Sequence, residues 1–271
     1  GLTLSAFQHV CTRLGVETTM RQVDLEGEPV AVPADANVRV IRSVAANAVS
    51  RWGATTVAEV VTKFSEESPS RESTVACQLV LERLPGLRWL DRESGWFWFG
   101  AEGRNRVLNR VMKMFAVANP LSVGELRRGI ARSQHMDGFA PPRRVLKAML
   151  EQTPGLDVRD EEVWWVGSQA EICDALSSAE ATIVDVLRGI GPVASVHELE
   201  SACLETGLNR VTVRLHLSHS PSIMRLAQGV YTVVGTIVPP EAFEAARKSA
   251  GTKRRGKRSV LQDYGWKDSD T

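Results

Sequence analysis

The side chains best suited to chemistry in this sequence are arginines and polar groups spaced along predicted helices. In NRVTVRLHLSH (residues 209–219), two apolar residues four positions apart, Val213 and Leu217, are predicted to face inward. Asn209 then caps the helix, and the positions left outside are Arg210, Thr212, Arg214 and His216. Arginine and asparagine at the start of such a helix can form paired hydrogen bonds with base edges, so these side chains are candidate contacts to double-stranded DNA. A merely solvated helix face is the alternative.

A second basic region lies in the middle of the chain. Arg143, Arg144 and Lys147 give one predicted helix a basic face, and Arg127 and Arg128 lie on the helix before it. Several phosphate contacts would produce binding that weakens steeply as the salt concentration rises. Arginine and lysine are also the usual exposed residues of helices, so a solvated surface is the competing explanation here too.

The charge of the whole chain is almost balanced, with 33 Lys and Arg against 32 Asp and Glu and a net charge of +1. A surface that binds nucleic acid must therefore be a confined basic patch, because the molecule as a whole is not a polycation. Near the end of the chain, the run KRRGKR contains Lys253, Arg254 and Arg255 and is predicted to be flexible. It could hold a phosphate backbone without reading sequence, or it could be a plain linker.

No sequence pattern points to catalysis or to a cofactor. Glycine-rich phosphate loops, the G-x-S-x-G elbow and the H-E-x-x-H zinc motif are missing from the sequence. His216, His219 and Cys203 do not make a zinc finger, which needs a second nearby cysteine and a wider histidine spacing. We therefore expect no enzyme activity, no metal and no small-molecule cofactor.

Aromatic residues concentrate in LRWLDRESGWFWF (residues 87–99), which predicts a strand, a turn at Glu93-Ser94-Gly95 and a return strand. The large side chains are too many for one small core. Trp89, Trp96 and Trp98 are therefore predicted to form an interface with another module or a second chain. Filling of the core is the alternative explanation for them.

Three segments of the chain repeat one order of predicted elements: a helix, a short second helix, a third helix and a β-hairpin. The fragments ATTVAEV, PLSVGEL and PVASVHEL occupy one place in this order, and LPGLRWL…GWFWF, TPGLDVR…VWWVG and SPSIMRL…GVYTVVG occupy another. A plain helical bundle has no reason to end each copy in a hairpin. The order predicts a winged helix-turn-helix, whose third helix normally enters the major groove.

The expected fold is mainly α with small β-hairpin wings (α+β), in a tandem array of three winged-helix domains. The predicted boundaries of these domains are 38–103, 104–176 and 177–238. Residues 1–37 predict a helix and a hairpin that would be half of a truncated winged unit, and residues 239–271 predict a basic linker or the start of a truncated domain. The chain opens with Gly1 and ends in polar sequence at Thr271, which suggests a piece of a longer protein.

The segments PLSVGELRRGI and GPVASVHELESAC, together with the closing SPSIMRLAQGVYTVVG, resemble the HARE-type winged helix-turn-helix. They also resemble bacterial regulators that join such modules to sigma-factor region-4-like helices. The resemblance covers roughly residues 38–235 and implies DNA binding or transcription-associated scaffolding without catalysis. We expect a DNA-binding transcription regulator. The alternatives are a scaffold that docks a partner or a second copy of the chain, and an accessory module of a nuclease or defence system.

The cysteines and the apolar runs indicate in which cellular compartment the protein is expected. Cys11, Cys77, Cys173 and Cys203 are far apart in the chain and form no C-x-x-C pair, as expected in a reducing environment. No apolar run in the sequence is long enough to span a bilayer, and the first residues lack the pattern of a signal peptide. We expect a cytoplasmic protein that does not act on membranes.

Overall fold

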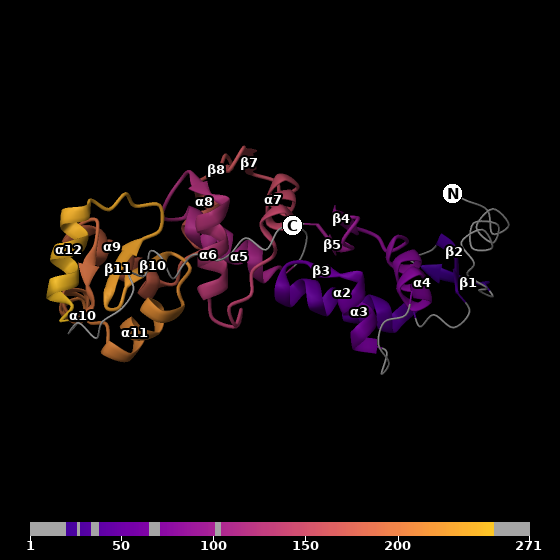
Figure 1. Cartoon of the computed structure of the whole chain (residues 1–271), viewed down its shortest axis with the longest axis horizontal. Helices are drawn as coiled ribbons and strands as arrows, with labels where there is room; N and C mark the ends of the chain where they lie inside the picture. Colours follow the sequence, from indigo (N-terminus) through magenta and orange to yellow (C-terminus); the bar gives the residue numbers. More distant parts are fainter. Residues whose placement is uncertain (1–19, 26–27, 34–37, 65–70, 101–103, 252–271) are drawn as a thin grey trace. The chain divides into compact units, whose positions relative to one another are not determined.

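The structure is a computed structural model that describes residues 20–25, 28–33, 38–64, 71–100 and 104–251 (Figure 1). Within these ranges the chain is an α+β protein with eleven helices, a two-stranded hairpin and three small three-stranded antiparallel sheets. It divides into two compact units. Unit 1 comprises the described residues up to Arg106 together with Arg144–Thr153, and unit 2 comprises Val107–Arg143 and the described residues from Pro154 onward.

The described part of unit 1 contains an antiparallel hairpin, three complete helices, most of a fourth helix and a small sheet. The hairpin strands are β1 (Met20–Leu25) and β2 (Glu28–Pro33), which confirms the predicted pairing; its turn and the helix expected before it lie outside the described residues. The remaining elements are α2 (Val38–Trp52), β3 (Thr55–Thr56), α3 (Val57–Phe64), α4 (Arg71–Leu81), β4 (Arg88–Asp91), β5 (Trp96–Trp98) and nearly all of α7 (Arg143–Glu151).

Unit 2 contains the rest of the helices and two further sheets. Its elements are α5 (Arg106–Phe115, beginning in unit 1), β6 (Leu121–Ser122), α6 (Val123–Arg132), β7 (Leu156–Arg159), β8 (Glu162–Trp165), α8 (Ala170–Cys173), α9 (Ser178–Ile190), β9 (Ala194–Ser195), α10 (Val196–Glu205), α11 (Arg210–His219), β10 (Ile223–Ala227), β11 (Val230–Val233) and α12 (Pro240–Ser249). None of the described helices in either unit is long and apolar enough to cross a membrane.

One element order occurs three times, and it includes a strand that the sequence pattern did not predict. Each copy runs helix, two-residue strand, helix, helix and hairpin. In each sheet the two-residue strand pairs with the second strand of the hairpin, giving the orders β3-β5-β4, β6-β8-β7 and β9-β11-β10. The short strand therefore ties the start of the second helix to the hairpin. The boundaries predicted for three separate domains stay a prediction.

The second helix of each copy begins at a hydroxyl cap. The hydroxyl accepts a hydrogen bond from the backbone amide of a glutamate three residues on, in the pairs Thr56 with Glu59, Ser122 with Glu125 and Ser195 with Glu198. In the second and third pairs the glutamate side chain also accepts from the amide of the cap, which completes a capping box. Each such cap stabilises its helix by about 1 kcal/mol.

The first helix ends at a glycine. Ile41, Ala45, Ala48 and Val49 are buried along one face of α2, whereas Val40 is 37% exposed. Gly53 follows the helix with a φ of 81°, and its amide donates to the Val49 carbonyl. A left-handed residue at this position favours glycine, because other residues are strained there.

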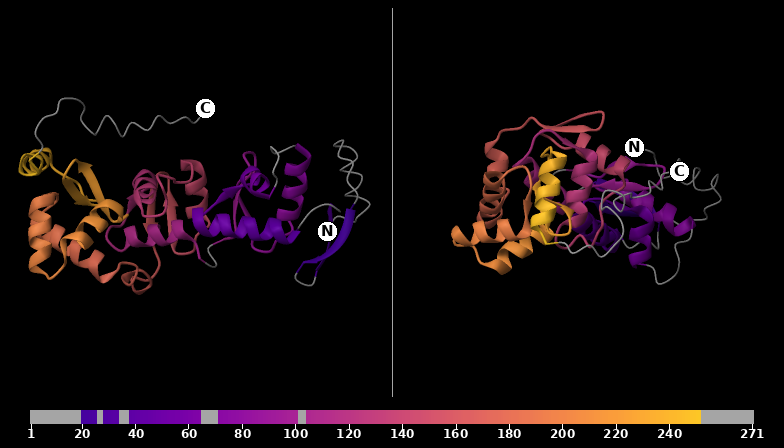
Figure 2. Two further views of the ribbon diagram at one scale, coloured as in Figure 1. Left: turned by 90° about the horizontal axis from the view of Figure 1, so that it is seen from below. Right: turned by 60° about the vertical axis from the view of Figure 1, so that its left-hand side comes forward.

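Helix α12 corrects the expectation of a linker after residue 238. It lies against strands β9 and β11 (Figure 2), and buried Ala246 shares an apolar cluster with Val193 and Val230, onto which Phe243 also packs. The amphipathic spacing of PEAFEAA was too short to show on which sheet it would pack. Residues 240–249 therefore belong to the third copy, whereas residues 252–271 lie outside the described part of the chain.

The second and third copies pack directly on each other within unit 2. The Ser222 hydroxyl donates to the Lys113 carbonyl at 2.9 Å, and the Arg132 guanidinium donates to the Leu217 carbonyl at 2.7 Å. At Gly129 of α6 there is no room for a side chain, since a Cβ there would lie 3.0 Å from the Pro221 carbonyl oxygen and would overlap the sulfur of Met114. This junction is close-packed.

We expect Gly129→Ala to destabilise unit 2 by about 1–3 kcal/mol, because an added methyl in a filled junction forces neighbouring atoms apart. Gly124→Ala is the matched control on the same helix, since a Cβ there meets only the Ser122 hydroxyl at 3.9 Å. The control is expected to be neutral or slightly stabilising. Urea denaturation followed by circular dichroism measures both variants, and equal stabilities would contradict the close packing.

Candidate nucleic-acid interface

Helix α11 carries the best-defined candidate surface. Its N-cap is Asn209, whose side-chain oxygen accepts from the Thr212 amide at 2.8 Å, as predicted. Val213 and Leu217 are buried, also as predicted, so that the opposite side of the helix faces outward. Asn209 uses its oxygen in the cap and keeps its amide group exposed for a ligand.

Two arginines on the outer side of α11 share one carboxylate. Glu200 of α10 lies 3.2 Å from the Arg210 Nε and 2.6 Å from the Arg214 Nε. The Glu200 side chain is 5% exposed, whereas those of Arg210 and Arg214 are 60% and 64% exposed. The hydrogen bond and the charge of Glu200 raise the pKa of Arg214 above its ordinary value. Glu200 thus holds both guanidinium groups at the surface and cancels one of their two charges.

Two apolar residues on α11 are also exposed, and their exposure was not predicted from the sequence. Val211 is 79% exposed and Leu215 is 46% exposed. In RVTVRLHLSH, apolar residues alternate from Val211 to Leu217, so helical spacing alone permits either pair to face inward. An exposed valine or leucine beside arginines can touch a thymine methyl group or the apolar surface of a protein.

His216 is not an outer residue, which corrects its assignment as a DNA contact. Its side chain is 19% exposed, and its Nδ1 lies 3.9 Å from the Glu180 carboxylate. Burial lowers the pKa of His216; Glu180 opposes this shift, Lys113 adds to it, and the result lies below the ordinary value of 6.5. The imidazole is therefore neutral near pH 7 and supplies no charge to a phosphate. Thr212 is half-buried on the same helix.

The basic residues predicted on α7 are distributed over the two units. In unit 2, Arg143 forms an exposed ion pair with Glu161 at 2.6 Å. In unit 1, Arg144 lies 2.8 Å from the Asp91 carboxylate and donates to the Ser94 hydroxyl at 2.7 Å, while Lys147 is half-buried. The Ser94 hydrogen bond, with the charge of Arg144, lowers the pKa of Asp91. The paired residues Arg143 and Arg144 thus already have acidic neighbours.

The other predicted cations have mixed placements. Arg127 of α6 donates from its Nε to the Pro141 carbonyl at 3.1 Å, which ties it to the loop before α7, whereas Arg128 is exposed. Lys253, Arg254 and Arg255 lie outside the described residues. Their predicted phosphate contacts stay predictions.

The tryptophans of the first hairpin have different environments. Trp98 is fully buried, and its indole N–H donates to the Gln152 side chain at 3.0 Å. Trp98 is therefore part of the core and contacts a residue of the segment predicted as the second module, in agreement with the predicted contact to another module, but it offers no surface to a second chain. Trp89 and Trp96 are half-buried; the Trp89 ring packs edge-on against Phe97, with Arg92 over its face. For these two the interface stays a prediction.

The described residues contain no group of three metal-binding side chains. Burial raises the pKa of the Cys77 thiol to about 12 and raises that of Cys203 as well, so both thiols stay protonated and unreactive at neutral pH. No protein-family model matches the sequence, and no curated protein matches it. The function is therefore inferred from the repeated architecture and from α11.

Proposed function

We propose that the chain is a non-catalytic tandem winged-helix protein that binds double-stranded DNA through the outer side of α11. Each copy has three helices, a short strand and a hairpin wing, connected in the order of a winged helix-turn-helix. In that architecture the third helix is the one that enters the major groove. The same proposal includes a role in regulating transcription in the cytoplasm.

The observation that carries this proposal is the pair of exposed arginines held by Glu200. Their guanidinium groups point outward from α11 at 60% and 64% exposure, one helical turn apart. Because Glu200 is almost completely buried, it restricts both side chains while leaving their outer N–H groups for phosphates or guanine edges. A ligand that binds there meets donors that have already lost part of their conformational entropy.

Replacing both arginines by alanine is expected to weaken duplex binding at least about tenfold and to reduce the salt slope by about 2. Glu200→Gln should act in the opposite direction, because it removes the negative charge beneath the arginines and keeps a hydrogen-bonding group. Fluorescence anisotropy with a labelled mixed-sequence duplex, measured over a salt series, gives both quantities.

Arg247→Ala is the control for the loss of an exposed arginine, and it removes one positive charge where the double variant removes two. Arg247 lies on α12 in an exposed pair with Glu244, so that its loss should leave duplex binding unchanged. Undetectable binding at low salt, or equal affinities for the double variant and the control, would defeat the proposal. An affinity lowered by Glu200→Gln would also contradict the role given to Glu200.

The exposed apolar pair on α11 favours a second candidate function, in which this helix docks a protein. Val211 and Leu215 lie one helical turn apart and present apolar surface beside the arginines. Val211→Ser with Leu215→Ser separates the two candidates. If the helix docks a protein, the variant should lose the complex with that protein, which light scattering detects as a lower mass. If the helix binds DNA, the variant should keep the salt dependence of its duplex affinity.

A further inference from the structure

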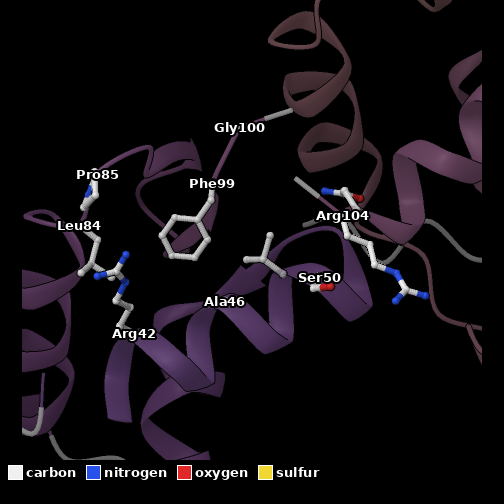
Figure 3. A pocket seen from close by; sticks show the side chains of 10 residues that line it. Arg42, Ala46, Ser50, Leu84, Pro85, Phe99, Gly100 and Arg104 are labelled. Carbon is white, nitrogen blue, oxygen red and sulfur yellow. The ribbon is translucent and has the colours of Figure 1, made fainter. Parts of the chain in front are cut away.

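Unit 1 contains a cavity of about 320 Å³ that neither DNA contact nor core packing uses (Figure 3). It lies between one side of α2, the turn after α4 and the residues that follow β5. The described residues of its lining are Arg42, Ala46, Val49, Ser50, Leu84, Pro85, Phe99, Gly100, Arg104 and Asn105. The volume is at the lower end of the range of small-molecule sites.

Small residues on α2 keep this cavity open. Arg42, Ala46 and Ser50 follow one another at intervals of four and therefore share one side of the helix. Figure 3 shows Ala46 and Ser50 on α2 and the Phe99 ring above them. Ala46 is exposed, and a larger side chain there would occupy the space in front of the ring.

The Phe99 ring is held in place by its neighbour. It packs edge-on against Phe97, with ring centroids 5.9 Å apart and planes at 79°, and Phe97 is fully buried. Leu84 and Val49 add buried apolar walls. One face of a fixed aromatic ring, bordered by aliphatic groups, suits a flat apolar ligand that stacks in an offset manner.

Among the described residues of the lining, the charged groups are both positive. Arg42 and Arg104 lie at opposite ends of the cavity, with Phe99 between them (Figure 3), and none of the ten lining residues is acidic. The amide of Asn105 is fixed by a hydrogen bond from its nitrogen to the Gly53 carbonyl at 3.0 Å. A guanidinium group at the edge of an apolar cavity pairs well with a carboxylate, because its planar donors match the two oxygens.

We propose that this cavity binds a small aromatic carboxylate, with its ring on Phe99 and its carboxylate on the Arg104 end. Occupancy would stabilise unit 1, since the ligand contacts α2 and the segment after β5 in the folded state only. The chain would then sense an organic acid in addition to binding through α11. This site stands independently of the proposed DNA contact.

The probe is 2-naphthoate, measured by isothermal titration calorimetry on the whole chain. We expect saturable one-to-one binding, and at least about tenfold weaker binding of the uncharged 2-naphthamide. Ala46→Leu should abolish binding by filling the cavity, and Arg104→Met should weaken it at least about tenfold by removing the charge. Both positions are exposed, so the variants are expected to fold, which circular dichroism checks.

Two control variants keep the test specific. Asn47→Leu adds the same side chain to an exposed position of α2 outside the cavity, and Arg51→Met removes a guanidinium that lies over the Trp52 ring, also outside the cavity. Both should bind 2-naphthoate as the parent chain does. Absence of saturable binding at millimolar naphthoate would overturn the proposal, as would Ala46→Leu or Arg104→Met binding as tightly as the controls, or naphthamide binding as tightly as naphthoate.

Discussion

Replacing Lys113 by methionine is expected to lower the free energy of unfolding of unit 2 by about 3–5 kcal/mol, the largest effect that we predict for a single charged residue. Lys113 of α5 lies 2.5 Å from the carboxylate of Glu180 on α9, and the Glu180 side chain is only 3% exposed. Removing the lysine leaves a buried carboxylate without its cation. Such a charge costs far more than the pair itself contributes.

The protonation state of Glu180 supports the size of this effect. Burial raises the pKa of Glu180, but the hydrogen bond and charge of Lys113, together with bonds involving Ser177 and Ser220, outweigh it and place the pKa below its ordinary value. Without Lys113 the burial effect prevails, and the carboxyl group takes up a proton more readily. Glu180 also completes the capping box of α9 with Ser177, so its displacement would uncap that helix.

Urea denaturation followed by circular dichroism measures the loss. Arg247→Met is the matched control in unit 2, because its pair with Glu244 is exposed and worth well below 1 kcal/mol. The double variant Lys113→Met with Glu180→Gln should recover part of the stability, since no unpaired charge remains. A loss for Lys113→Met no larger than that of Arg247→Met would contradict the importance given to the pair.

Trp98→Ala should cost unit 1 about 3–5 kcal/mol, the usual range for truncating a large buried aromatic residue. Trp98 is fully buried in β5, and its loss would leave a cavity between the strand and its neighbours. It would also remove the hydrogen bond that the Trp98 indole N–H donates to the Gln152 side-chain oxygen. The amide nitrogen of Gln152 donates to the Trp89 carbonyl at 3.1 Å. Gln152 thus links the two strands of the hairpin to the segment that follows α7.

Trp96→Ala is the control for this variant, because Trp96 belongs to the same strand and is only half-buried. Its expected cost is clearly smaller, since less apolar surface loses its burial. Unfolding monitored by circular dichroism avoids the change in fluorescence that loss of a tryptophan brings. If the two substitutions cost the same, Trp98 would not have the core role that its burial indicates.

Local signals were sufficient to predict much of the fold. The cap at Asn209 and the hairpin at residues 20–33 follow from backbone preferences that act over a few residues. The strands β3, β6 and β9 were not predicted, because two residues are too few to show an alternating pattern. Their pairing with the hairpin depends on contacts distant in sequence.

The candidate site was predicted less completely than the fold. Asn209, Arg210 and Arg214 were found from helical spacing, but their partner Glu200 comes from the preceding helix, and nothing in the linear pattern links the two. His216 was predicted on the outer side of α11, because helical spacing does not show which neighbouring elements pack beside a residue at the border of the buried face. The aromatic and arginine lining of the cavity in unit 1 was missed for a similar reason, since it combines residues from Arg42 to Asn105.

The junction between the second and third copies has a further consequence for how the chain can vary. Side chains of Ser222, Arg132 and Arg188 donate to the carbonyls of Lys113, Leu217 and Val117, so each accepting group is part of the main chain. Every residue type supplies such an acceptor. Mutational scanning should therefore find that the three donors resist replacement because of these bonds. The side chains of Lys113, Leu217 and Val117 are constrained only by their other contacts, such as the pair of Lys113 with Glu180.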